Sequence, residues 1–510
     1  MLAKVLSAAL MGIDALSVEV EVDIAQRGLP HFSMVGLPDA AVKESRDRVK
    51  AALKNVGFNF PLKPVTVNLA PADLRKEGSA FDLPIAVGLA AAEGAIPLVA
   101  MDGFLFTGEL SLDGALKPVR GALSMALLAQ KEEKKLILPG ANAREAAVVE
   151  GVEVYGAGSL PEVIEYLRGS GSIERTVVSL AEVMAENSVY EEDFSDVKGQ
   201  EHAKRALEVA AAGGHNVLMI GPPGSGKTML SKRLPTVLPP ISFTEALETT
   251  RIHSVAGGMR PADGAVIARR PFRSPHHTIS DVALIGGGQN PRPGEVSLSH
   301  NGVLFLDELP EFKRSVLEVL RQPIEDGVVT VSRAVASVTY PAGFMLVAAM
   351  NPCPCGYFGD PRHQCTCSAS AIHRYRTRVS GPLMDRFDIH IEVPAVPYKE
   401  LSAEYAGEPS RAVRERVIRA RERQLERYGG TSVFSNSRMR TRHVKKHCRL
   451  RQEAHELLEM AMHKLGLSAR AYTRVLKLSR SIADLEGAED ILTHHVSEAI
   501  QYRTLDRGWV

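Results

Sequence analysis

The spacing of hydrophobic and polar positions divides the chain into regions with different secondary structure. Over residues 1–168, segments that alternate apolar and polar residues, such as LSVEVEVDI and PVTVNLA, predict strands. Between them lie stretches with helical spacing, such as AAVKESRDRVKAALKNVG and PEVIEYLR. We therefore expect residues 1–168 to form a self-contained α+β domain.

The rest of the chain divides into a linker and two further regions. Residues 169–195 are rich in Gly and Ser at the start and acidic at the end, which predicts a linker. Over 196–397, apolar strands alternate with helices in the manner of a parallel sheet, and 398–510 are helical in pattern. The expected fold class is α/β, with an N-terminal α+β domain and a C-terminal helical domain.

Length and composition fit an ordinary globular protein. The 510 residues are 45% hydrophobic and 24% charged, enough for two or three domains with their own cores. No segment approaches the ~20 apolar residues that a transmembrane helix needs, and the apolar N-terminal stretch is short and broken by Asp14. We therefore expect a cytoplasmic protein with no membrane partner, in which clustered cysteines hold metal rather than form disulfides.

The segment HNVLMIGPPGSGKTML has the spacing of a phosphate-binding loop between a strand and a helix. Glycines in such a loop let backbone N–H groups surround an anionic phosphate at a helix N-terminus. Lys227 supplies a positive charge to the β- and γ-phosphates, and the Thr228 hydroxyl is a ligand for Mg²⁺. The predicted ATP-binding residues are Gly221, Pro222, Pro223, Gly224, Ser225, Gly226, Lys227 and Thr228.

Two more apolar strands end in polar residues suited to ATP hydrolysis. GVLFLDELPEF ends in Asp307 and Glu308, at the edge of the sheet where ligands of open α/β folds bind. We expect Asp307 to hold Mg²⁺ and Glu308 to deprotonate the attacking water. FMLVAAMN ends in Asn351, whose amide can position that water.

Several arginines are candidates for a contact with the γ-phosphate. Arg386, in SGPLMDRFDIHIEV, either pairs locally with Asp385 or Asp388 or reaches a neighbouring subunit's nucleotide as an arginine finger. Helical spacing brings three further arginines near one another, Arg470, Arg474 and Arg480. We expect one of these three to sense the γ-phosphate.

Four segments resemble the AAA+ proteins of the magnesium-chelatase-like ComM/YifB family, and the match extends over nearly the whole chain. The segments are DVKGQEHAKRALEVAAAGGHNVLMIGPPGSGKT, GVLFLDELPEF, AAMNPCPCG and SGPLMDRFDIHIEVP. The resemblance implies an AAA+ core in the α/β region, a helical lid after it, and a hexamer that binds ATP and Mg²⁺. It also implies that Asn351 is sensor 1, that Arg386 is a finger acting in trans, and that Arg470, or else Arg474, is sensor 2.

Related ring motors carry β-hairpins that line a central pore, and two segments here resemble such hairpins. One lies between the phosphate loop and Asp307 and also contains His276 and His277; the other is GVVTVSRAVASVTYPAG. Basic loops that point into one channel would follow a phosphate backbone without reading sequence. The predicted DNA-binding residues are Arg269, Arg270, Arg273 and Arg333. Each segment could instead be a surface turn, and the two histidines could hold a metal.

Positive charge is concentrated in one stretch of the C-terminal region. The net charge of the chain is +1, yet residues 411–451 contain 14 Lys and Arg against 3 Glu. This stretch is either a surface that binds a polyanion or a solvated helical face with pairs such as Glu415 with Arg419.

The N-terminal region resembles the Lon-type proteolytic domain, which has a ribosomal S5-like fold. RKEGSAFDLPIA resembles the loop that carries the nucleophilic serine, here Ser79, and FTGELSLDGALKPVRGALSMALLA resembles the segment that carries its lysine. Where the lysine is expected after Gly121, this chain has Ala122, Leu123 and Ser124. A serine without a base to accept its proton is a poor nucleophile. We therefore expect a non-proteolytic domain that serves assembly or faces DNA.

Four of the five cysteines lie in NPCPCGYFGDPRHQCTCS, which begins at Asn351. Two C-x-C pairs separated by nine residues can supply four thiolates to a tetrahedral zinc ion. The expected ligands are Cys353, Cys355, Cys365 and Cys367, with His363 as an alternative ligand. Free thiols or a redox pair are the other interpretations. A zinc here would hold the loop still beside the strand that ends in Asn351.

These features predict an ATP-driven, ring-forming DNA motor. The family resemblance implies a branch-migration helicase that acts in natural transformation and recombination on single-stranded or branched DNA. A chelatase-type motor that remodels a protein partner is the alternative, and an ATP-dependent protease is a third. The missing lysine argues against the protease, and the basic segments favour DNA over a protein client.

Overall fold

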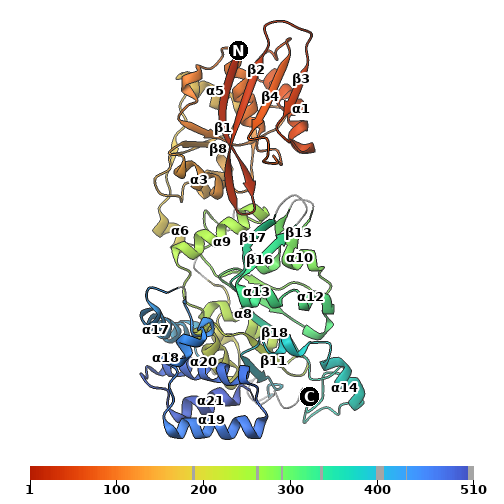
Figure 1. Ribbon diagram of the computed structural model, residues 1–510, viewed down its shortest axis with the longest axis vertical. Coiled ribbons are helices and arrows are strands. Elements are labelled where there is room, and N and C mark those ends of the chain that lie inside the picture. The colour runs from red at the N-terminus through yellow and green to blue at the C-terminus, as the bar shows by residue number, and fades with distance from the viewer. Residues whose placement is uncertain are drawn as a thin grey trace. The chain divides into compact units, whose positions relative to one another are not determined.

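The chain divides into two compact units, each with its own core (Figure 1). Unit 1 comprises Met1–Asn187 and Phe243–Ala268, and unit 2 comprises Ser188–Ser242 and Arg269–Val510. The computed structural model describes residues 1–186, 190–259, 264–288, 291–332, 337–397, 407–431 and 433–503. Residues 243–268, expected within the α/β region, thus belong with the N-terminal part of the chain.

Unit 1 is built on an eight-stranded mixed sheet with the order β10-β9-β8-β5-β1-β2-β4-β3. Its strands are β1 (Leu2–Met11), β2 (Asp14–Ile24), β3 (Phe32–Val35), β4 (Val65–Ala70), β5 (Phe104–Phe106), β8 (Lys135–Pro139), β9 (Val154–Ala157) and β10 (Arg175–Thr176). The alternation in β2 buries Val18, Val20 and Val22 on one face. β6 (Glu109–Leu110) and β7 (Leu116–Lys117) form a separate short ladder. The predicted linker contributes β10 to this sheet.

The helices of unit 1 include one that the chain supplies from a distant position. They are α1 (Ala40–Asn55), α2 (Asp82–Ala92), α3 (Ala122–Lys131), α4 (Gly140–Ala146), α5 (Leu160–Arg168), α6 (Leu180–Glu186) and α9 (Phe243–Ala256). α9 packs against α3, and Ser254 on α9 donates a hydrogen bond to the buried carboxylate of Glu145. Arg251 donates to the backbone carbonyl of Ile13, 3.2 Å away in the turn between β1 and β2. Residues 243–256 are therefore fixed to unit 1 by specific contacts.

Unit 2 contains a five-stranded parallel sheet with the order β12-β15-β18-β11-β19. The strands are β11 (Val217–Ile220), β12 (Phe272–Arg273), β15 (Val303–Leu306), β18 (Met345–Met350) and β19 (Ile389–Glu392). The four residues of β11 and of β15 and the six of β18 are all buried, as expected for strands covered on both faces. The predicted parallel α/β sheet is confirmed.

Helices surround this sheet and form the C-terminal helical region. Around the sheet lie α7 (Glu201–Gly213), α8 (Lys227–Val237), α10 (Asp281–Ile285), α11 (Glu295–Leu298), α12 (Arg314–Glu318), α13 (Arg321–Asp326), α14 (Ala369–Arg376) and α15 (Gly381–Met384). The C-terminal helices are α17 (Ser410–Tyr428), α18 (Thr441–His447), α19 (Gln452–Leu465), α20 (Ala469–Glu486) and α21 (Thr493–Gln501). α17 and α20 pack on α7, so one core joins the helical region to the sheet. The predicted C-terminal helices are present.

Two short ladders project from unit 2. β16 (Val328–Ser332) pairs with β17 (Ser337–Pro341), which confirms the hairpin predicted there. β13 (Gly286–Gly287) pairs with β14 (Arg292–Pro293) in the other predicted insertion. Among the helices of the described ranges, none combines the length and apolar content that crossing a lipid bilayer requires.

Candidate functional site

The phosphate loop lies between β11 and α8, as the sequence predicts. Gly224 and Gly226 have φ values of 73° and 91°, in the left-handed region that favours glycine. A Cβ added at either position would meet nothing within 4 Å, so open space lies beside the loop backbone. Because α8 begins at Lys227, its first N–H groups lack helical partners and are available to bind an anion.

Lys227 is buried behind this loop and bonded to it. Its Nζ donates to the carbonyl oxygens of Gly221 (2.7 Å) and Pro222 (2.9 Å) and to Oδ1 of Asn351 (3.3 Å). Burial lowers the pKa of the Lys227 ammonium to about 8, and the negative charge of Asp307 opposes this shift only in part. A phosphate at the loop would therefore stabilise the charged form of Lys227, which burial disfavours.

The sheet register brings the acidic residues to the same place. Leu306 of β15 lies opposite Ala348 of β18, so both strands end at one edge of the sheet. Thr228 donates a hydrogen bond to Oδ2 of Asp307 at 2.7 Å. These two oxygens are the types that Mg²⁺ prefers, and they are already adjacent.

Glu308, the next residue, has an exposed carboxylate and a strained backbone. Its φ is 53°, which is uncommon for a residue other than glycine. Its N–H donates to Oδ1 of Asp307 at 2.9 Å. Its Oε2 lies 3.3 Å from Nδ1 of His277. The contacts thus link Lys227 to Asn351 and Thr228 to Asp307, with Glu308 directly beside the second pair.

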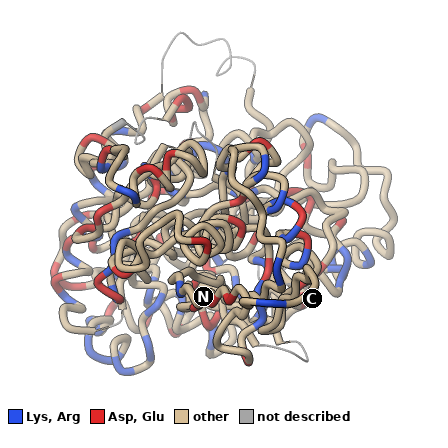
Figure 2. Tube along the Cα trace, turned by 90° about the horizontal axis from the view of Figure 1, so that it is seen from above, with Lys and Arg blue, Asp and Glu red and all other residues tan. Residues whose placement is uncertain are grey.

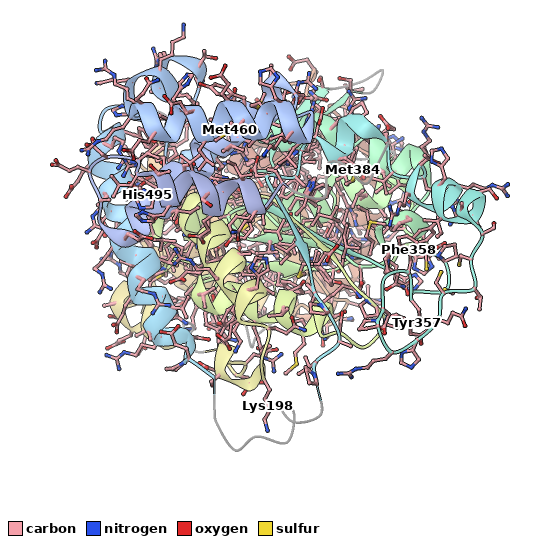
Figure 3. All side chains as sticks on the ribbon, turned by 90° about the horizontal axis from the view of Figure 1, so that it is seen from below. Lys198, Tyr357, Phe358, Met384, Met460 and His495 are labelled. Carbon is pink, nitrogen blue, oxygen red and sulfur yellow. The ribbon has the colours of Figure 1, made fainter. Side chains whose placement is uncertain are left out.

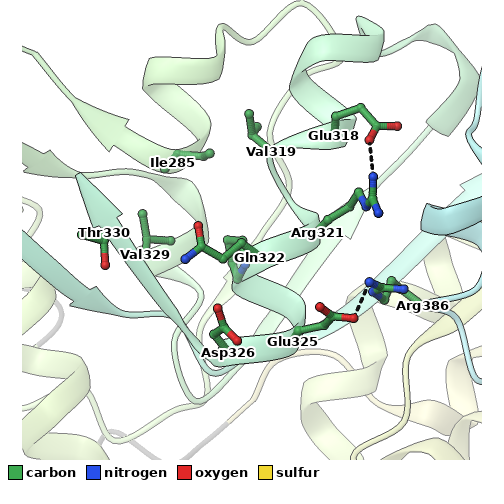
Figure 4. Close-up of a pocket in the computed structure, with 11 residues that line it drawn as sticks. Ile285, Glu318, Val319, Arg321, Gln322, Glu325, Asp326, Val329, Thr330 and Arg386 are labelled. Carbon is green, nitrogen blue, oxygen red and sulfur yellow. Dashed lines mark hydrogen bonds and ion pairs between the residues drawn. The ribbon is translucent and has the colours of Figure 1, made fainter. Parts of the chain in front are cut away.

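The candidate arginine finger has a partner that the sequence did not suggest. Arg386 forms an ion pair with Glu325 on α13, at the border of a pocket of about 430 Å³ (Figure 4). Its NH1 group also donates to the carbonyl of Pro382 at 3.2 Å. The two local acids considered for Arg386, Asp385 and Asp388, pair with other arginines.

Those other arginines are the two sensor 2 candidates, and their environments differ. Arg470 pairs with Asp385 at 3.3 Å and is 65% exposed. Arg474 is largely buried and pairs with Asp388 at 3.2 Å. Burial alone would raise the pKa of Asp388, but the hydrogen bond with His215 and the charge of Arg474 hold it well below its usual range. Arg470 is therefore the more accessible candidate, and Arg474 belongs to a buried network.

Two of the predicted DNA-binding arginines are bonded within unit 2. Arg273 lies on β12, not on a loop, and its guanidinium makes two hydrogen bonds of 2.6 Å to Glu295. Arg270 donates to the carbonyl of Asn301 at 2.7 Å and to two proline carbonyls. Arg269 is exposed, and Arg333 lies outside the described residues. The expectation that Arg273 projects from an insertion loop is therefore wrong, because β12 extends the central sheet.

The basic stretch 411–451 is also partly engaged in internal ion pairs. Figure 2 marks the charged residues along the trace. Arg416 pairs with Glu208 at 2.5 Å, and Arg427 pairs with the buried Asp484. Glu415 pairs with Arg411 at 3.1 Å and not with the expected Arg419. Internal pairing thus accounts for part of the local excess of positive charge.

The four clustered cysteines come together as a metal site requires. Their sulfur atoms lie within 4.8 Å of one another, with Cys353 3.3 Å from Cys355 and 3.7 Å from Cys365. Four sulfurs at about 2.3 Å from a tetrahedral zinc lie about 3.8 Å apart, close to these spacings. Backbone N–H groups point at the sulfurs, including that of Phe358 at 3.3 Å from Cys353. Figure 3 labels Tyr357 and Phe358 in this loop.

The clusters that contain histidine match a metal site less well than the four cysteines do. His494 and His495 both contact Glu486, at 2.8 and 2.9 Å. Nδ1 of His495 accepts the N–H of Leu492, so its Nε2 carries the proton that Glu486 accepts and is not free to bind a metal. Of the predicted histidine pair, His276 contacts Thr278 and His277 contacts Glu308, and the metal-type clusters found among the described residues do not include them.

The serine of the protease-like region has a carboxylate partner. Ser79 donates a hydrogen bond to Oε2 of Glu109. Ala122, Leu123 and Ser124 begin α3 and are buried, so none of the positions expected for the lysine supplies an amine. This arrangement lacks the amine that the Lon-type resemblance requires.

The sequence analysis missed two residues that support the site, Gln200 and Glu325, and did not link His277 to Glu308. Gln200 donates to the carbonyl of Ser225 at 3.3 Å and so braces the phosphate loop. Its place just before α7 in DVKGQEHAKRAL is a signal that could have found it. No local sequence signature indicates that Glu325 pairs with Arg386. The same holds for His277 and Glu308, because each pair joins separate elements.

Comparison with known proteins agrees with this geometry, which is that of a P-loop ATPase. Residues 193–401 match the family model "Magnesium chelatase, subunit ChlI", residues 20–142 match "Subunit ChlI of Mg-chelatase", and residues 407–503 match "Magnesium chelatase, subunit ChlI C-terminal". The chain is similar to Competence protein ComM of Haemophilus influenzae, with 46% identity covering 99% of this chain and 98% of that protein. It is equally similar, at 46%, to the protein YifB of Salmonella typhimurium over 99% of this chain and 98% of the relative.

A more distant similarity concerns the protease-like region. Lon protease 2 of Bacillus subtilis is 29% identical over 161 residues, which are 29% of this chain and 28% of that protein. Together, the matches define the class as an AAA+ ATPase of the magnesium-chelatase type. The chain belongs to the ComM/YifB family of these proteins.

Proposed function

We propose that the protein is an ATP-driven, ring-forming DNA motor that migrates branched DNA in the cytoplasm during natural transformation and recombination. Its full-length similarity to a protein named for competence is the observation that carries this proposal. Competence for transformation is a process that handles incoming DNA, and an ATPase core supplies the energy that such handling needs.

ATP and Mg²⁺ fit the residues at the edge of the sheet. The loop backbone over 221–226 would bind the phosphates, and Lys227 would exchange its carbonyl partners for phosphate oxygens. Thr228 and Asp307 would hold Mg²⁺, which neutralises charge on the β- and γ-phosphates. Glu308 takes the proton of the attacking water, while Asn351 orients that water.

A ring of six subunits would complete each site with Arg386 of a neighbour. Within one chain Arg386 is held by Glu325, a single carboxylate. The γ-phosphate of a neighbouring subunit carries more negative charge and would compete for the guanidinium. We assign Arg386 as the finger in trans and Arg470, the more exposed candidate, as sensor 2.

We assign the DNA contacts to two arginines of the predicted insertions. They are Arg269, which is exposed, and Arg333, which lies outside the described residues and follows β16 in the sequence. Arg270 and Arg273 stabilise the fold through their contacts with backbone carbonyls and with Glu295. We therefore do not assign them to contacts with the phosphates of DNA. Such contacts follow the backbone of DNA and predict weak sequence preference and steep salt dependence.

A structural zinc held by Cys353, Cys355, Cys365 and Cys367 completes the proposal. The sulfur spacing and the N–H groups that point at the sulfurs support a four-thiolate site. The zinc would supply a crosslink that fixes the loop after β18, where Asn351 lies.

A chelatase-type motor that remodels a protein client is the second candidate. It is favoured by the family models, which name a magnesium chelatase subunit in three segments. The internal pairing of Arg416 and Arg427 also weakens the electrostatic case for DNA. A protease is disfavoured, because Ala122, Leu123 and Ser124 supply no amine.

The steady-state ATPase rate of the purified protein, measured alone and with single-stranded, duplex and branched DNA, tests the proposal. A DNA motor should be stimulated several-fold, most by branched DNA, and the stimulation should fall steeply with salt. Arg269→Ala should reduce the stimulation and spare the basal rate. An ATPase rate that none of the three DNAs changes would favour the protein-remodelling alternative.

A further inference from the structure

The turn after β12 brings a histidine to the carboxylate expected to activate water. β12 pairs in parallel with β15, with Arg273 opposite Leu304. The chain therefore leaves β12 at the same edge of the sheet at which β15 ends and Glu308 follows. His277, four residues after β12, places Nδ1 3.3 Å from Oε2 of Glu308.

Contacts on both sides fix the position of this turn. On the strand side, the ring of Phe272 stacks on that of Phe305 at 5.9 Å, and Arg273 is bound by two hydrogen bonds to Glu295. After His277, the N–H of Ile279 donates to the carbonyl of His276 at 3.0 Å, which closes a tight turn. The position of His277 is thus set by the sheet and by its own turn.

The ring of His277 is also packed. It lies 4.1 Å from the ring of His276 and meets Phe312 edge-on at 6.4 Å. Its side chain is 30% exposed. Nδ1 lies at an ion-pair distance of 3.3 Å from Oε2 of Glu308, and a hydrogen carried by Nδ1 would face a carboxylate, which can only accept. The ring of His277 is therefore held on two sides, with Nδ1 toward the carboxylate of Glu308.

Glu308, in contrast, has little else to hold it. Its side chain is 56% exposed, and its φ of 53° lies in a sparsely populated region. Asp307 beside it is fixed by Thr228. In the described part of the chain, His277 is the ion-pair partner that Glu308 has. A base that must face one water within a few tenths of an ångström needs such support.

We propose that His277 is a positioning residue for Glu308. Its Nδ1–H donates to one carboxylate oxygen and thereby turns the other oxygen toward the water that attacks the γ-phosphate. The proposal rests on the proposed function, namely that Glu308 is the base. It predicts that the loss of the donor slows the chemical step and leaves ATP binding unchanged.

The test compares two substitutions in the full-length protein. His277→Phe keeps a ring against His276 and Phe312 but removes the donor, so kcat should fall by about 10- to 100-fold, the scale of a misplaced reacting group, while KM for ATP stays within about twofold. His277→Asn, whose Nδ2 can take the place of Nδ1, should recover most of the rate. His494→Phe, which removes a similar histidine–glutamate pair away from the site, should leave kcat unchanged.

Glu308→Gln, alone and combined with His277→Phe, separates this proposal from the one it rests on. If Glu308→Gln hydrolyses ATP at the wild-type rate, the base is misassigned and both proposals fail. If Glu308→Gln is inactive but His277→Phe keeps the wild-type kcat, only the role of His277 is overturned. It is also overturned if His277→Asn fails to recover activity, or if His277→Phe slows the residual turnover of Glu308→Gln further.

Discussion

Each unit carries a site that resembles a known catalytic site, and the two differ in whether the reacting residues have the partners that their chemistry needs. In unit 2, Lys227 contacts Asn351 and Thr228 contacts Asp307, so residues from three strands converge. In unit 1, Ser79 is present and donates to Glu109, but Ala122, Leu123 and Ser124 stand where an amine is expected. The difference shows that a residue of a catalytic motif can react only when the partners that activate it are also present. We therefore expect changes in unit 2 to stop turnover and changes at Ser79 to have no effect.

The largest effect is expected from Arg386→Ala. An arginine finger contributes about 10³- to 10⁵-fold to turnover, so the variant should bind ATP but hydrolyse it at a small fraction of the wild-type rate. Mixing it with Glu308→Gln should restore some activity, because hybrid interfaces combine an intact base with an intact finger. Mixed rings that form but regain no activity would place Arg386 outside the neighbouring site.

The pH dependence of ATP binding should report on Lys227. Burial puts the pKa of this ammonium at about 8 in the free protein, and a bound phosphate favours the charged form and so raises that pKa. Binding above pH 8 must then take up a proton, and affinity should fall by up to tenfold per pH unit. Calorimetry at pH 8.5 in two buffers with different ionisation enthalpies measures the uptake. Binding without proton uptake would show that Lys227 is already charged in the free protein.

A smaller effect is expected from the loss of the cysteine cluster. The purified protein should carry about one zinc per chain. Cys365→Ser should lose that zinc and lower Tm by roughly 4–10 °C, given about 2–4 °C per kcal/mol for a domain of this size. Cys448→Ala, which changes the fifth cysteine in the C-terminal helical region, should keep its zinc. Full stability in metal-free protein under reducing conditions would argue against a structural zinc.

The smallest effect is expected at the serine of unit 1. Ser79→Ala removes the hydrogen bond to Glu109. The variant should nevertheless keep an ATPase activity and a Tm within error of the wild-type values. The wild-type protein should not cleave an unfolded protein such as casein in the presence of ATP. ATP-dependent cleavage that Ser79→Ala abolishes would mean that Glu109 serves as the missing base, and the contrast between the two units would no longer hold.

The parts of the site that the sequence predicted are those encoded in short segments. β11, the phosphate loop and α8 are adjacent in the chain, and strand endings at Asp307 and Asn351 identify the same sheet edge by a general rule of parallel sheets. The hairpin of β16 and β17 was likewise visible in its alternation. Local pattern suffices wherever neighbours in sequence are also neighbours in space.

The parts that could not be predicted depend on contacts between distant residues. Nothing in the sequence of α9 indicates that Ser254 reaches Glu145 and joins unit 1. The same holds for Arg386 with Glu325, which the sequence would pair with a nearer acid. The sequence pattern did not indicate that Arg273 lies on a strand, because β12 has only two residues, too few to be recognised.

Branch migration itself tests the central claim most directly. A labelled four-way DNA junction, incubated with the protein and ATP, should be resolved into duplex products at a rate that depends on hydrolysis. Glu308→Gln should bind the same junction and ATP but convert less than a hundredth as much, in line with the loss of a general base. Conversion that proceeds equally well with Glu308→Gln, or a wild-type protein that hydrolyses ATP but never moves the junction, would contradict an ATP-driven DNA motor.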